Sequence, residues 1–129
     1  MSTVHPWFAG TTVQDAANWT FTSFKETSVD VANTLVNKPQ MYIAEIGWPT
    51  LSSTTANKTD GAPNASEPSL QIFINNFVCT ANTQGTKYFF LEFTDILWKE
   101  RVYPGSGFWG LFHSNKTLKA ITLPDCSHD

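Results

Sequence analysis

Two glutamates interrupt the two most apolar segments of the sequence. Residues 40–46 (QMYIAEI) and 87–93 (KYFFLEF) have the pattern of parallel strands covered on both faces, yet they contain Glu45 and Glu92. Burying an ionised carboxylate is costly unless it is paired or opens onto a solvent-filled site. Sites in parallel α/β folds form at the carboxyl ends of the strands, where both glutamates are expected. The pattern indicates either reactive carboxylates or two acids ion-paired with Lys or Arg at the sheet edge.

Side chains alternate between the two faces of a strand, which predicts the neighbours of each glutamate. The residues expected to share a face are Met41, Ile43 and Glu45 in the first segment, and Tyr88, Phe90 and Glu92 in the second. Neighbouring parallel strands lie about 4.8 Å apart. We therefore expect the two carboxylates to approach each other at one end of the sheet.

Helical patterns separate the apolar segments. Thr12 has the position of an N-cap, with Asp15 three residues later, and an apolar stripe extends from there to Phe24. A second helix is expected from Leu70, with apolar residues at i, i+3, i+4, i+7 and i+8, and Gly85 ends it. Strands alternating with helices predict a βαβαβ unit with right-handed crossovers.

Three further segments complete the pattern. Residues 3–8 are expected to form a short strand, although Pro6 weakens it as a central strand. Residues 50–69 are rich in Ser, Thr, Asn and Pro and are interpreted as a long surface loop. Residues 108–112 (FWGLF) are interpreted as a further short strand. No internal repeat is present.

Composition limits the class of protein. The 129 residues carry a net charge of −3, with 41% hydrophobic and only 15% charged residues, so we expect one globular domain over residues 1–129. No basic stripe is available to neutralise phosphates, which argues against nucleic acid as a partner. Apolar stretches of five or six residues argue against membrane insertion. No cluster has metal-ligand spacing, so neither a metal nor a cofactor is expected.

Cysteines and sequons suggest an extracellular origin. Asn-x-Ser/Thr sequons occur at Asn18, Asn57, Asn64 and Asn115. The two cysteines, at 79 and 126, are either a disulfide or two unrelated buried thiols. Residues 1–7 lack the basic and apolar regions of a signal peptide. The expectation is that a signal was removed or that the chain begins inside a longer parent.

Residues 42–50 (YIAEIGWPT) resemble the nucleophile motif Glu-x-Gly-Trp-Pro-Ser/Thr of glycoside hydrolase family 17. The fungal β-1,3-glucanases and glucan transglycosylases of that family are the nearest in pattern. The likeness continues over segments 4–8, 16–19, 77–79, 88–95, 98–99, 108–112 and 124–126. It therefore extends over essentially the whole chain.

The resemblance implies a (β/α)₈ barrel, of which this chain supplies a part corresponding to the last three strands. By resemblance Glu45 is the nucleophile of a retaining glycosidase, and Glu92 is a candidate second carboxylate. The family places its acid/base Glu in an Asn-Glu motif after the fourth strand, and this sequence contains no Asn-Glu dipeptide. That position is expected upstream of Met1, so the isolated chain is expected to be weakly active or inactive.

Other candidate residues would surround the nucleophile. Trp48, Trp7 and Trp98 are expected to rim the same end of the sheet and cover the apolar faces of glucose rings. The remaining candidates for substrate binding are His5, Asp95 and Lys99. Trp19 and Trp109 are interpreted as packing residues. Ile96 departs from the acid found there in many fungal relatives. The resemblance also favours a Cys79–Cys126 disulfide.

Two functions remain open. The first is a β-1,3-glucan-active hydrolase or transglycosylase of the fungal cell wall. The second is a secreted, non-catalytic protein that binds glucan or serves interactions. Both imply secretion or a cell-wall location for the parent protein.

Assembly follows from geometry. Three strands leave both sheet edges open, and Ile43 and Phe90 are expected to face an uncovered barrel interior. A homodimer or larger homo-oligomer would bury that face. The alternative is a monomer whose loops and tail cover it.

Overall fold

The computed structural model describes residues 1–52 and 64–127. Its elements follow the order β1 (Ser2–Thr3), α1 (Val13–Phe24), the π-helix η1 (Lys25–Val29), α2 (Asp30–Asn33), β2 (Ile43–Ile46), α3 (Glu67–Gln84), β3 (Tyr88–Phe90) and α4 (Leu97–Val102). The three strands form a parallel sheet in the order β1-β2-β3. The expected βαβαβ unit is confirmed.

Local sequence signals set the helix ends. The Thr12 hydroxyl accepts from the backbone N–H of Asp15 at 3.3 Å, so α1 begins at its expected cap. Helix α3 begins three residues before Leu70, because the Ser66 hydroxyl caps it by accepting from the Ser69 backbone N–H at 3.1 Å. Gly85 ends α3 in the left-handed region, at φ 72°.

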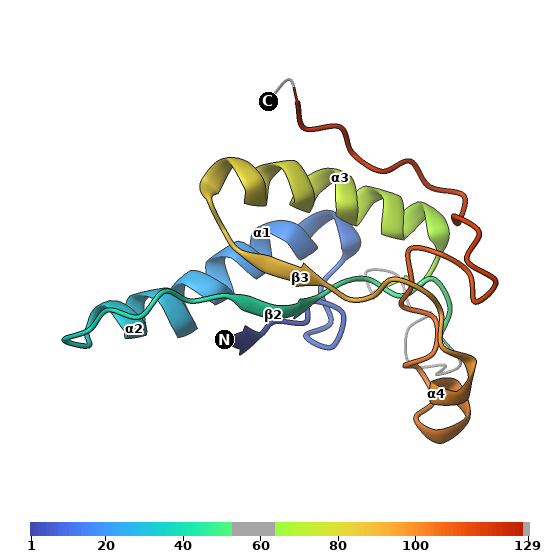
Figure 1. The fold of residues 1–129 in the computed structure, drawn as a ribbon, viewed down its shortest axis with the longest axis horizontal. Helices are drawn as coiled ribbons and strands as arrows, with labels where there is room; N and C mark the ends of the chain where they lie inside the picture. The colour runs from blue at the N-terminus through green and yellow to red at the C-terminus, as the bar shows by residue number, and fades with distance from the viewer. Residues whose placement is uncertain (53–63, 128–129) are drawn as a thin grey trace.

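Helices α1 and α3 both pack on the same face of the sheet (Figure 1). Aromatic rings join the two helices: Phe21 of α1 stacks on Phe77 of α3 at 5.2 Å, and Phe77 on Phe73 at 5.4 Å. Ile43 and Ile46 of β2 are fully buried in the same core. The opposite face of the sheet has no helix on it within the described chain.

The faces of β2 and β3 differ from the alternation expected. Ile43 is fully buried, whereas Glu45 is exposed, because the pairing of β2 with β3 shifts register between Ile43 and Ile46. Phe90 packs against Phe73 of α3, at 6.4 Å. The expectation that Ile43 and Phe90 face the barrel interior is therefore wrong.

Phe89 lies on the face of the sheet that would line the interior of a barrel. It alternates with Tyr88 and Phe90, which pack toward α3, and its side chain is 59% exposed. Tyr88 lies at 4.9 Å from the Phe77 ring, and burial raises the pKa of its phenol. The open face of the sheet thus carries exposed aromatic surface.

The expected strand over residues 3–8 is shorter than its pattern suggests. Strand β1 ends at Thr3, and residues 6–10 form turns. Pro6 has no N–H for a ladder, and its carbonyl accepts from both the backbone N–H and the hydroxyl of Thr11, at 3.2 and 3.1 Å. The chain therefore bends there.

The segment over residues 108–112 runs beside the end of β3 without forming a full strand. The backbone N–H of Glu92 donates to the Trp109 carbonyl at 2.9 Å, and that of Leu111 donates to the Glu92 carbonyl at 3.0 Å. Phe112 bridges Thr94 in parallel and Leu118 in antiparallel. This segment covers the edge beyond β3.

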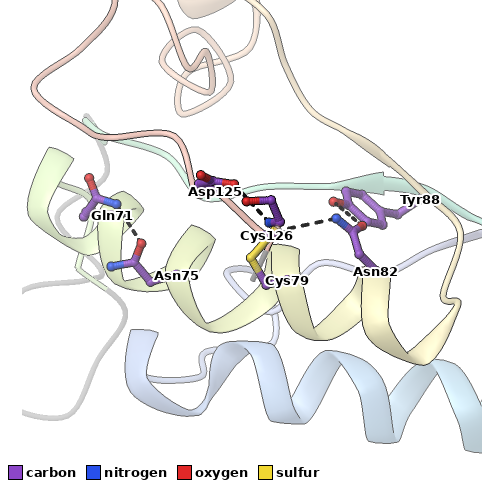
Figure 2. Close-up of a disulfide and its surroundings, with 8 residues drawn as sticks. Gln71, Asn75, Cys79, Asn82, Tyr88, Asp125 and Cys126 are labelled. Atoms are coloured by element: carbon purple, nitrogen blue, oxygen red, sulfur yellow. Dashed lines mark hydrogen bonds between the residues drawn. A yellow bond between two sulfur atoms is a disulfide. The ribbon is translucent and has the colours of Figure 1, made fainter. Parts of the chain in front are cut away.

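The C-terminal tail returns along α3 and is fastened to it (Figure 1, Figure 2). The expected Cys79–Cys126 disulfide is present, with the Cα atoms 5.3 Å apart. Gln71 of α3 donates to the Thr122 carbonyl at 3.0 Å and accepts from the Thr122 N–H at 2.6 Å. Beyond the disulfide, the Ser127 N–H donates to Asp125 and lowers the pKa of that carboxyl.

The structure describes three of the four sequon asparagines. Asn18, Asn64 and Asn115 are exposed, and Asn57 lies outside the described residues. No helix in the described part of the chain is long and apolar enough to cross a membrane.

Candidate active site

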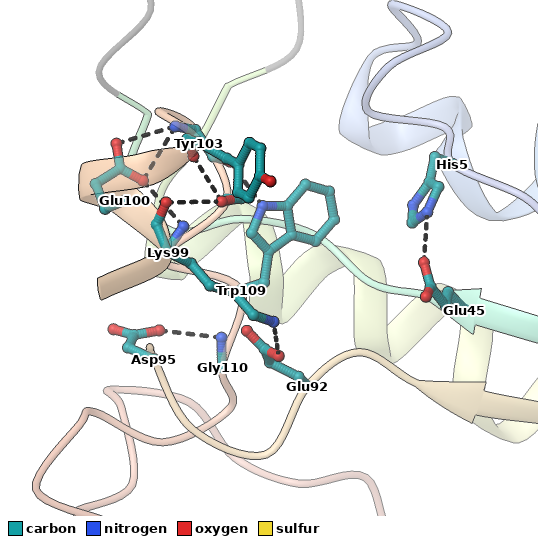
Figure 3. A network of polar contacts seen from close by, with 12 residues as sticks. His5, Glu45, Glu92, Asp95, Lys99, Glu100, Tyr103, Trp109 and Gly110 are labelled. Atoms are coloured by element: carbon teal, nitrogen blue, oxygen red, sulfur yellow. Dashed lines mark hydrogen bonds and ion pairs between the residues drawn. The ribbon is translucent and has the colours of Figure 1, made fainter. Parts of the chain in front are cut away.

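Glu45 lies in β2, two residues before Gly47, with a half-exposed side chain (49%). His5 Nε2 donates to Glu45 Oε2 at 3.2 Å (Figure 3). The Leu91 N–H donates to the Ile46 carbonyl at 2.7 Å, and a Cβ at Gly47 would overlap with the Leu91 carbonyl oxygen. The glycine of the Glu-x-Gly motif therefore lets the end of β2 approach the segment after β3 closely.

His5 is fixed by aromatic rings. Its imidazole meets Phe8 and Trp109 edge-on, at 5.4 and 5.8 Å. A carboxylate only accepts hydrogen bonds, so the proton must sit on Nε2. Nδ1 is buried and has no partner within the described residues. His5 thus orients the Glu45 carboxylate from a ring that has little freedom to turn.

Glu92 is paired rather than open. Its Oε2 accepts from Lys99 Nζ at 2.9 Å, and both side chains are largely buried. Its other oxygen, Oε1, is buried without a partner in the part of the chain that the structure describes. Glu92 adopts the ion-paired arrangement that the sequence left open for both acids.

Asp95 belongs to the interior. Lys119 Nζ lies 2.6 Å from its Oδ1, and the Gly110 backbone N–H donates to the same oxygen at 3.0 Å. Lys119 also donates to the Thr50 hydroxyl at 2.8 Å. Asp95 and Lys119 are both buried, so the expectation that Asp95 binds substrate is corrected: it ties three chain segments together.

The tryptophans divide into core and surface. Trp48 is fully buried, and its indole N–H donates to the Asn64 carbonyl at 2.8 Å. Trp7 is also buried and meets Trp48 edge-on at 5.3 Å. Neither ring has a face free for a sugar, so the expectation of sugar contact is wrong for both. Trp98 on α4 is 60% exposed, and Trp109 is buried as expected of a packing residue.

Helix α4 begins a loop that the sequence patterns did not reveal, because six residues are too few for a periodic signal. The Glu100 carboxylate accepts from the backbone N–H groups of Gly105 and Gly107, at 2.9–3.0 Å. The Trp109 indole donates to the Gly105 carbonyl at 2.8 Å. These bonds close the loop, which carries the exposed Trp98 and Tyr103, and Figure 3 shows Tyr103 next to Trp109.

The arrangement suits nucleophilic attack by a carboxylate on a glycosyl group. Glu45 is solvent-accessible and oriented, and Glu92 with Lys99 follows the next strand. No group of three or more His, Cys, Asp or Glu residues in the described ranges is placed to hold a metal ion.

Comparison with known sequences decides the family. Residues 1–110 match the BtgE/BtgC glycoside hydrolase domain. The chain belongs to that family. This glycoside hydrolase domain is related to β-1,3-glucanases and transglucosylases, as the likeness to family 17 implies.

Two fungal relatives align with almost all of this BtgE/BtgC domain. The btgC protein of Aspergillus niger is 36% identical over 137 residues, covering 98% of this chain and 20% of its own length. The glucan endo-1,3-β-glucosidase btgC of Emericella nidulans is 34% identical, with 98% and 21% covered. The chain therefore spans about a fifth of the length of the relatives it matches.

Solved structures show the fold. A glycoside hydrolase family 17 β-1,3-glucanosyltransferase from Rhizomucor miehei superposes with a TM-score of 0.75 at 18% identity, over 96% of this chain and 42% of the enzyme. An endo-laminarinase from Formosa Hel1_33_131 gives 0.73 at 19% identity, over 92% and 36%. The BtgE/BtgC domain described here is thus a partial (β/α)₈ barrel, as predicted.

Proposed function

We propose that this chain carries the nucleophile side of a retaining active site for β-1,3-glucan, with Glu45 as the nucleophile. The observation that carries the proposal is the half-exposed Glu45 carboxylate, held by His5 at 3.2 Å within a Glu-x-Gly-Trp-Pro motif. The relative from Emericella nidulans is named as a glucan endo-1,3-β-glucosidase. An active-site mutant of the Rhizomucor miehei enzyme was solved with laminaritriose, which supports a glucan oligosaccharide as ligand.

The first chemical step forms a bond between a Glu45 oxygen and the anomeric carbon while the glycosidic C–O bond breaks. The leaving oxygen takes both bonding electrons and a proton from an acid. Water, or the hydroxyl of a second sugar, then attacks the anomeric carbon, gives its proton to the conjugate base of that acid and releases the Glu45 carboxylate. His5 holds that carboxylate toward the substrate through both steps.

We assign the general acid, which protonates the leaving oxygen, to a residue outside this chain. Retaining enzymes place two carboxyl groups about 5–5.5 Å apart. The sequence has no Asn-Glu dipeptide. Glu92 is not free to serve as the acid, because its carboxylate accepts a hydrogen bond from the Lys99 ammonium. Residual turnover by the isolated chain would require Glu92 to act as an improvised acid. Such turnover should disappear in both Glu45→Gln and Glu92→Gln.

Sugar contact is proposed for the α4 loop. Trp98 and Tyr103 are exposed on a loop that Glu100 fixes through backbone hydrogen bonds. Aromatic rings with a polar edge suit the apolar faces of glucose. Lys99 and His5 add polar groups to the same end of the sheet.

Covalent trapping tests the proposal without the missing acid. A 2,4-dinitrophenyl 2-deoxy-2-fluoro-β-laminaribioside carries a leaving group that departs without protonation, and its fluorine slows hydrolysis of the adduct. We expect intact-protein and peptide mass spectrometry to place one disaccharide on Glu45. Glu45→Gln should remain unlabelled, whereas Glu26→Gln, an exposed control on η1, should label like the parent chain. Labelling elsewhere, or none, would overturn the assignment.

A binding-only role is the second candidate, and the absence of an Asn-Glu dipeptide from the sequence favours it. Such a protein would bind laminaritriose in an NMR titration yet show no adduct at Glu45. Loss of that binding in Trp98→Ala, with Trp19→Phe as the control, would locate the contact on α4.

Secretion to the fungal cell wall is proposed for the parent protein. The Cys79–Cys126 disulfide and the three exposed sequon asparagines support an oxidising, glycosylating route. Expression in a fungal host and digestion with an endoglycosidase tests this: a mass shift at Asn18, Asn64 or Asn115 is expected. An unglycosylated, intracellular product would contradict it.

A further inference from the structure

The Trp109 side chain contacts both the residue that holds Glu45 and the ring beside it. Its indole meets the His5 imidazole edge-on at 5.8 Å, and it stacks on Phe8 at 5.7 Å with an angle of 25° between the planes. Trp109 is only 2% exposed, so these contacts are made in the interior. Figure 3 shows Tyr103 next to the indole, and His5 on the side toward Glu45.

The indole also packs against the backbone that follows Glu45. A Cβ added to Gly47 would lie 3.4 Å from Trp109 Cε3, so the ring lies directly against the glycine of the Glu-x-Gly motif. Gly47 comes two residues after Glu45. The same ring therefore contacts the donor to the Glu45 carboxylate and the end of the strand that carries it.

The Trp109 backbone is joined to the other strand end. Its carbonyl accepts from the Glu92 N–H at 2.9 Å, and the Glu92 carbonyl accepts from the Leu111 N–H at 3.0 Å. The backbone of Trp109 is thus fixed beside the segment after β3, whereas its side chain lies against the end of β2. One residue links the two strand ends that carry Glu45 and Glu92.

A hydrogen bond to the α4 loop, residues 97–107, fixes the rotation of the indole. The indole N–H donates to the Gly105 carbonyl at 2.8 Å, and the Gly105 N–H donates to the Glu100 carboxylate at 3.0 Å. The Gly107 N–H also donates to Glu100, at 2.9 Å, and a Cβ at Gly107 would overlap with the Glu100 Cβ. Because a buried N–H without a partner is costly, the position of Gly105 determines how the ring is turned.

We propose that Trp109 is a positioning residue, which holds His5 and the end of β2 so that the Glu45 carboxylate and the α4 loop keep one relative geometry. The inference rests on the proposed function, because it concerns Glu45 as the nucleophile. Trp109 is buried and acts through His5 rather than by touching the sugar. Misplacing a reacting group by about 1 Å can cost about 100-fold in rate, so such a support affects the chemical step.

Trp109→Phe tests the proposal, because it keeps an aromatic ring and removes the N–H donor. Labelling of Glu45 by the fluorinated laminaribioside at several concentrations separates the maximal rate from the concentration that gives half of it. We expect the maximal rate to fall about 5-fold or more, the effect of one hydrogen bond, and the half-maximal concentration to change little. Trp19→Phe is the matched control on α1 and should label like the parent chain. Equal maximal rates for Trp109→Phe and the parent chain would overturn the proposal.

Glu100→Gln provides a second variant that leaves the indole itself intact. An amide has one acceptor oxygen instead of two, so Gly105 and Gly107 are held less firmly. The maximal rate should fall here too, by a smaller factor than in Trp109→Phe. Hydrogen exchange within α1 shows whether each variant is folded. Should Trp109→Phe fail to fold, an unchanged rate in folded Glu100→Gln would overturn the proposal.

Nitrogen-15 NMR of the His5 ring gives a measurement that does not depend on labelling. In mildly alkaline buffer, where an imidazole is neutral, the parent chain should show the Nε2–H tautomer that donates to Glu45. Trp109→Phe should show a mixture of tautomers, whereas Trp19→Phe should retain the parent spectrum. An unchanged His5 spectrum in Trp109→Phe would overturn the proposal. The expected change at His5 without any labelling of the parent chain would contradict Glu45 as nucleophile, yet support the placement of His5 by Trp109.

Discussion

The Glu45 carboxylate owes its orientation to a residue 40 positions away in the chain. His5 donates to one of its oxygens, and Phe8 and Trp109 hold the imidazole at 5.4 and 5.8 Å. Hydrogen bonds to charged groups contribute about 1.5–3 kcal/mol. His5 therefore acts as a positioning residue for the proposed nucleophile, without touching the reacting carbon itself.

Replacing His5 tests this role. His5→Ala should slow labelling of Glu45 by the fluorinated laminaribioside at least 10-fold, because the carboxylate loses its donor. His5→Gln places an amide N–H near the position of Nε2 and should recover much of the rate. Time-resolved mass spectrometry gives both rates. Equal rates for His5→Ala and the parent chain would exclude the positioning role.

The Asp95–Lys119 pair makes a separate prediction about stability. Lys119→Met keeps the length of the side chain but leaves the buried Asp95 carboxylate unpaired, which should cost about 3–5 kcal/mol. The double variant Asp95→Asn/Lys119→Met removes both charges, keeps an acceptor for the Gly110 N–H and should recover part of the loss. Urea unfolding measures both. A loss below about 1 kcal/mol in Lys119→Met would contradict a buried pair.

At the scale of elements, long-range ties hold the irregular C-terminal third in place. Residues 92–95 and 108–112 share backbone hydrogen bonds, and Glu100 closes the loop after α4. The tail is joined to α3 by Gln71 and by the disulfide (Figure 2). The tail has no helix or strand of its own, so these contacts hold it in place. Removing one of them should therefore loosen the tail more than it loosens α1.

Breaking the disulfide should release the tail before the core. The bridge closes a 47-residue separation, for which the chain-entropy model gives about 4 kcal/mol of stabilisation. In Cys79→Ser/Cys126→Ser, hydrogen exchange at residues 119–127 should accelerate far more than exchange within α1. Dithiothreitol should produce the same change in the parent chain and none in the variant. Uniform acceleration across both regions would indicate global unfolding instead.

The whole molecule has one covered and one open sheet face. Helices α1 and α3 bury one face, whereas Phe89 remains exposed on the other face, which would line the interior of a complete barrel. The structural relatives are matched over about two fifths of their length, so most of such a barrel lies outside this chain. Open edges and exposed aromatic surface favour association. We propose that the isolated chain forms a homodimer or larger homo-oligomer through this face.

Light scattering after gel filtration at low micromolar concentration tests the assembly. A mass of at least twice 14.4 kDa is expected for the parent chain. Phe89→Asp should shift it toward monomer, because a carboxylate would be buried unpaired in the interface. Val36→Asp adds the same charge at a fully exposed loop position and should leave the mass unchanged. A monomer that binds no hydrophobic dye would contradict the proposal.

Structural features that depend on residues close together in the chain could be predicted from the sequence. Thr12 and Gly85 mark helix ends through their own backbone and side-chain chemistry, and the structure has both. The apolar runs around Glu45 and Glu92 indicated parallel strands ending near two acids, which the sheet confirms. The Glu-x-Gly-Trp-Pro motif and the segments around it indicated the family and the disulfide, because motif spacing reflects the order of barrel strands.

Tertiary structure alone decided which side chains face inward. A register shift between Ile43 and Ile46 separated Ile43 from Glu45, and this follows from pairing with β3 rather than from the pattern of β2. Trp48 and Trp98 both lie near strand ends in the sequence, but packing buries the first and exposes the second. Lys119 forms an ion pair with Asp95, which lies 24 residues earlier in the chain. Burial and ion pairing depend on contacts between distant segments, and no single stretch of sequence specifies them.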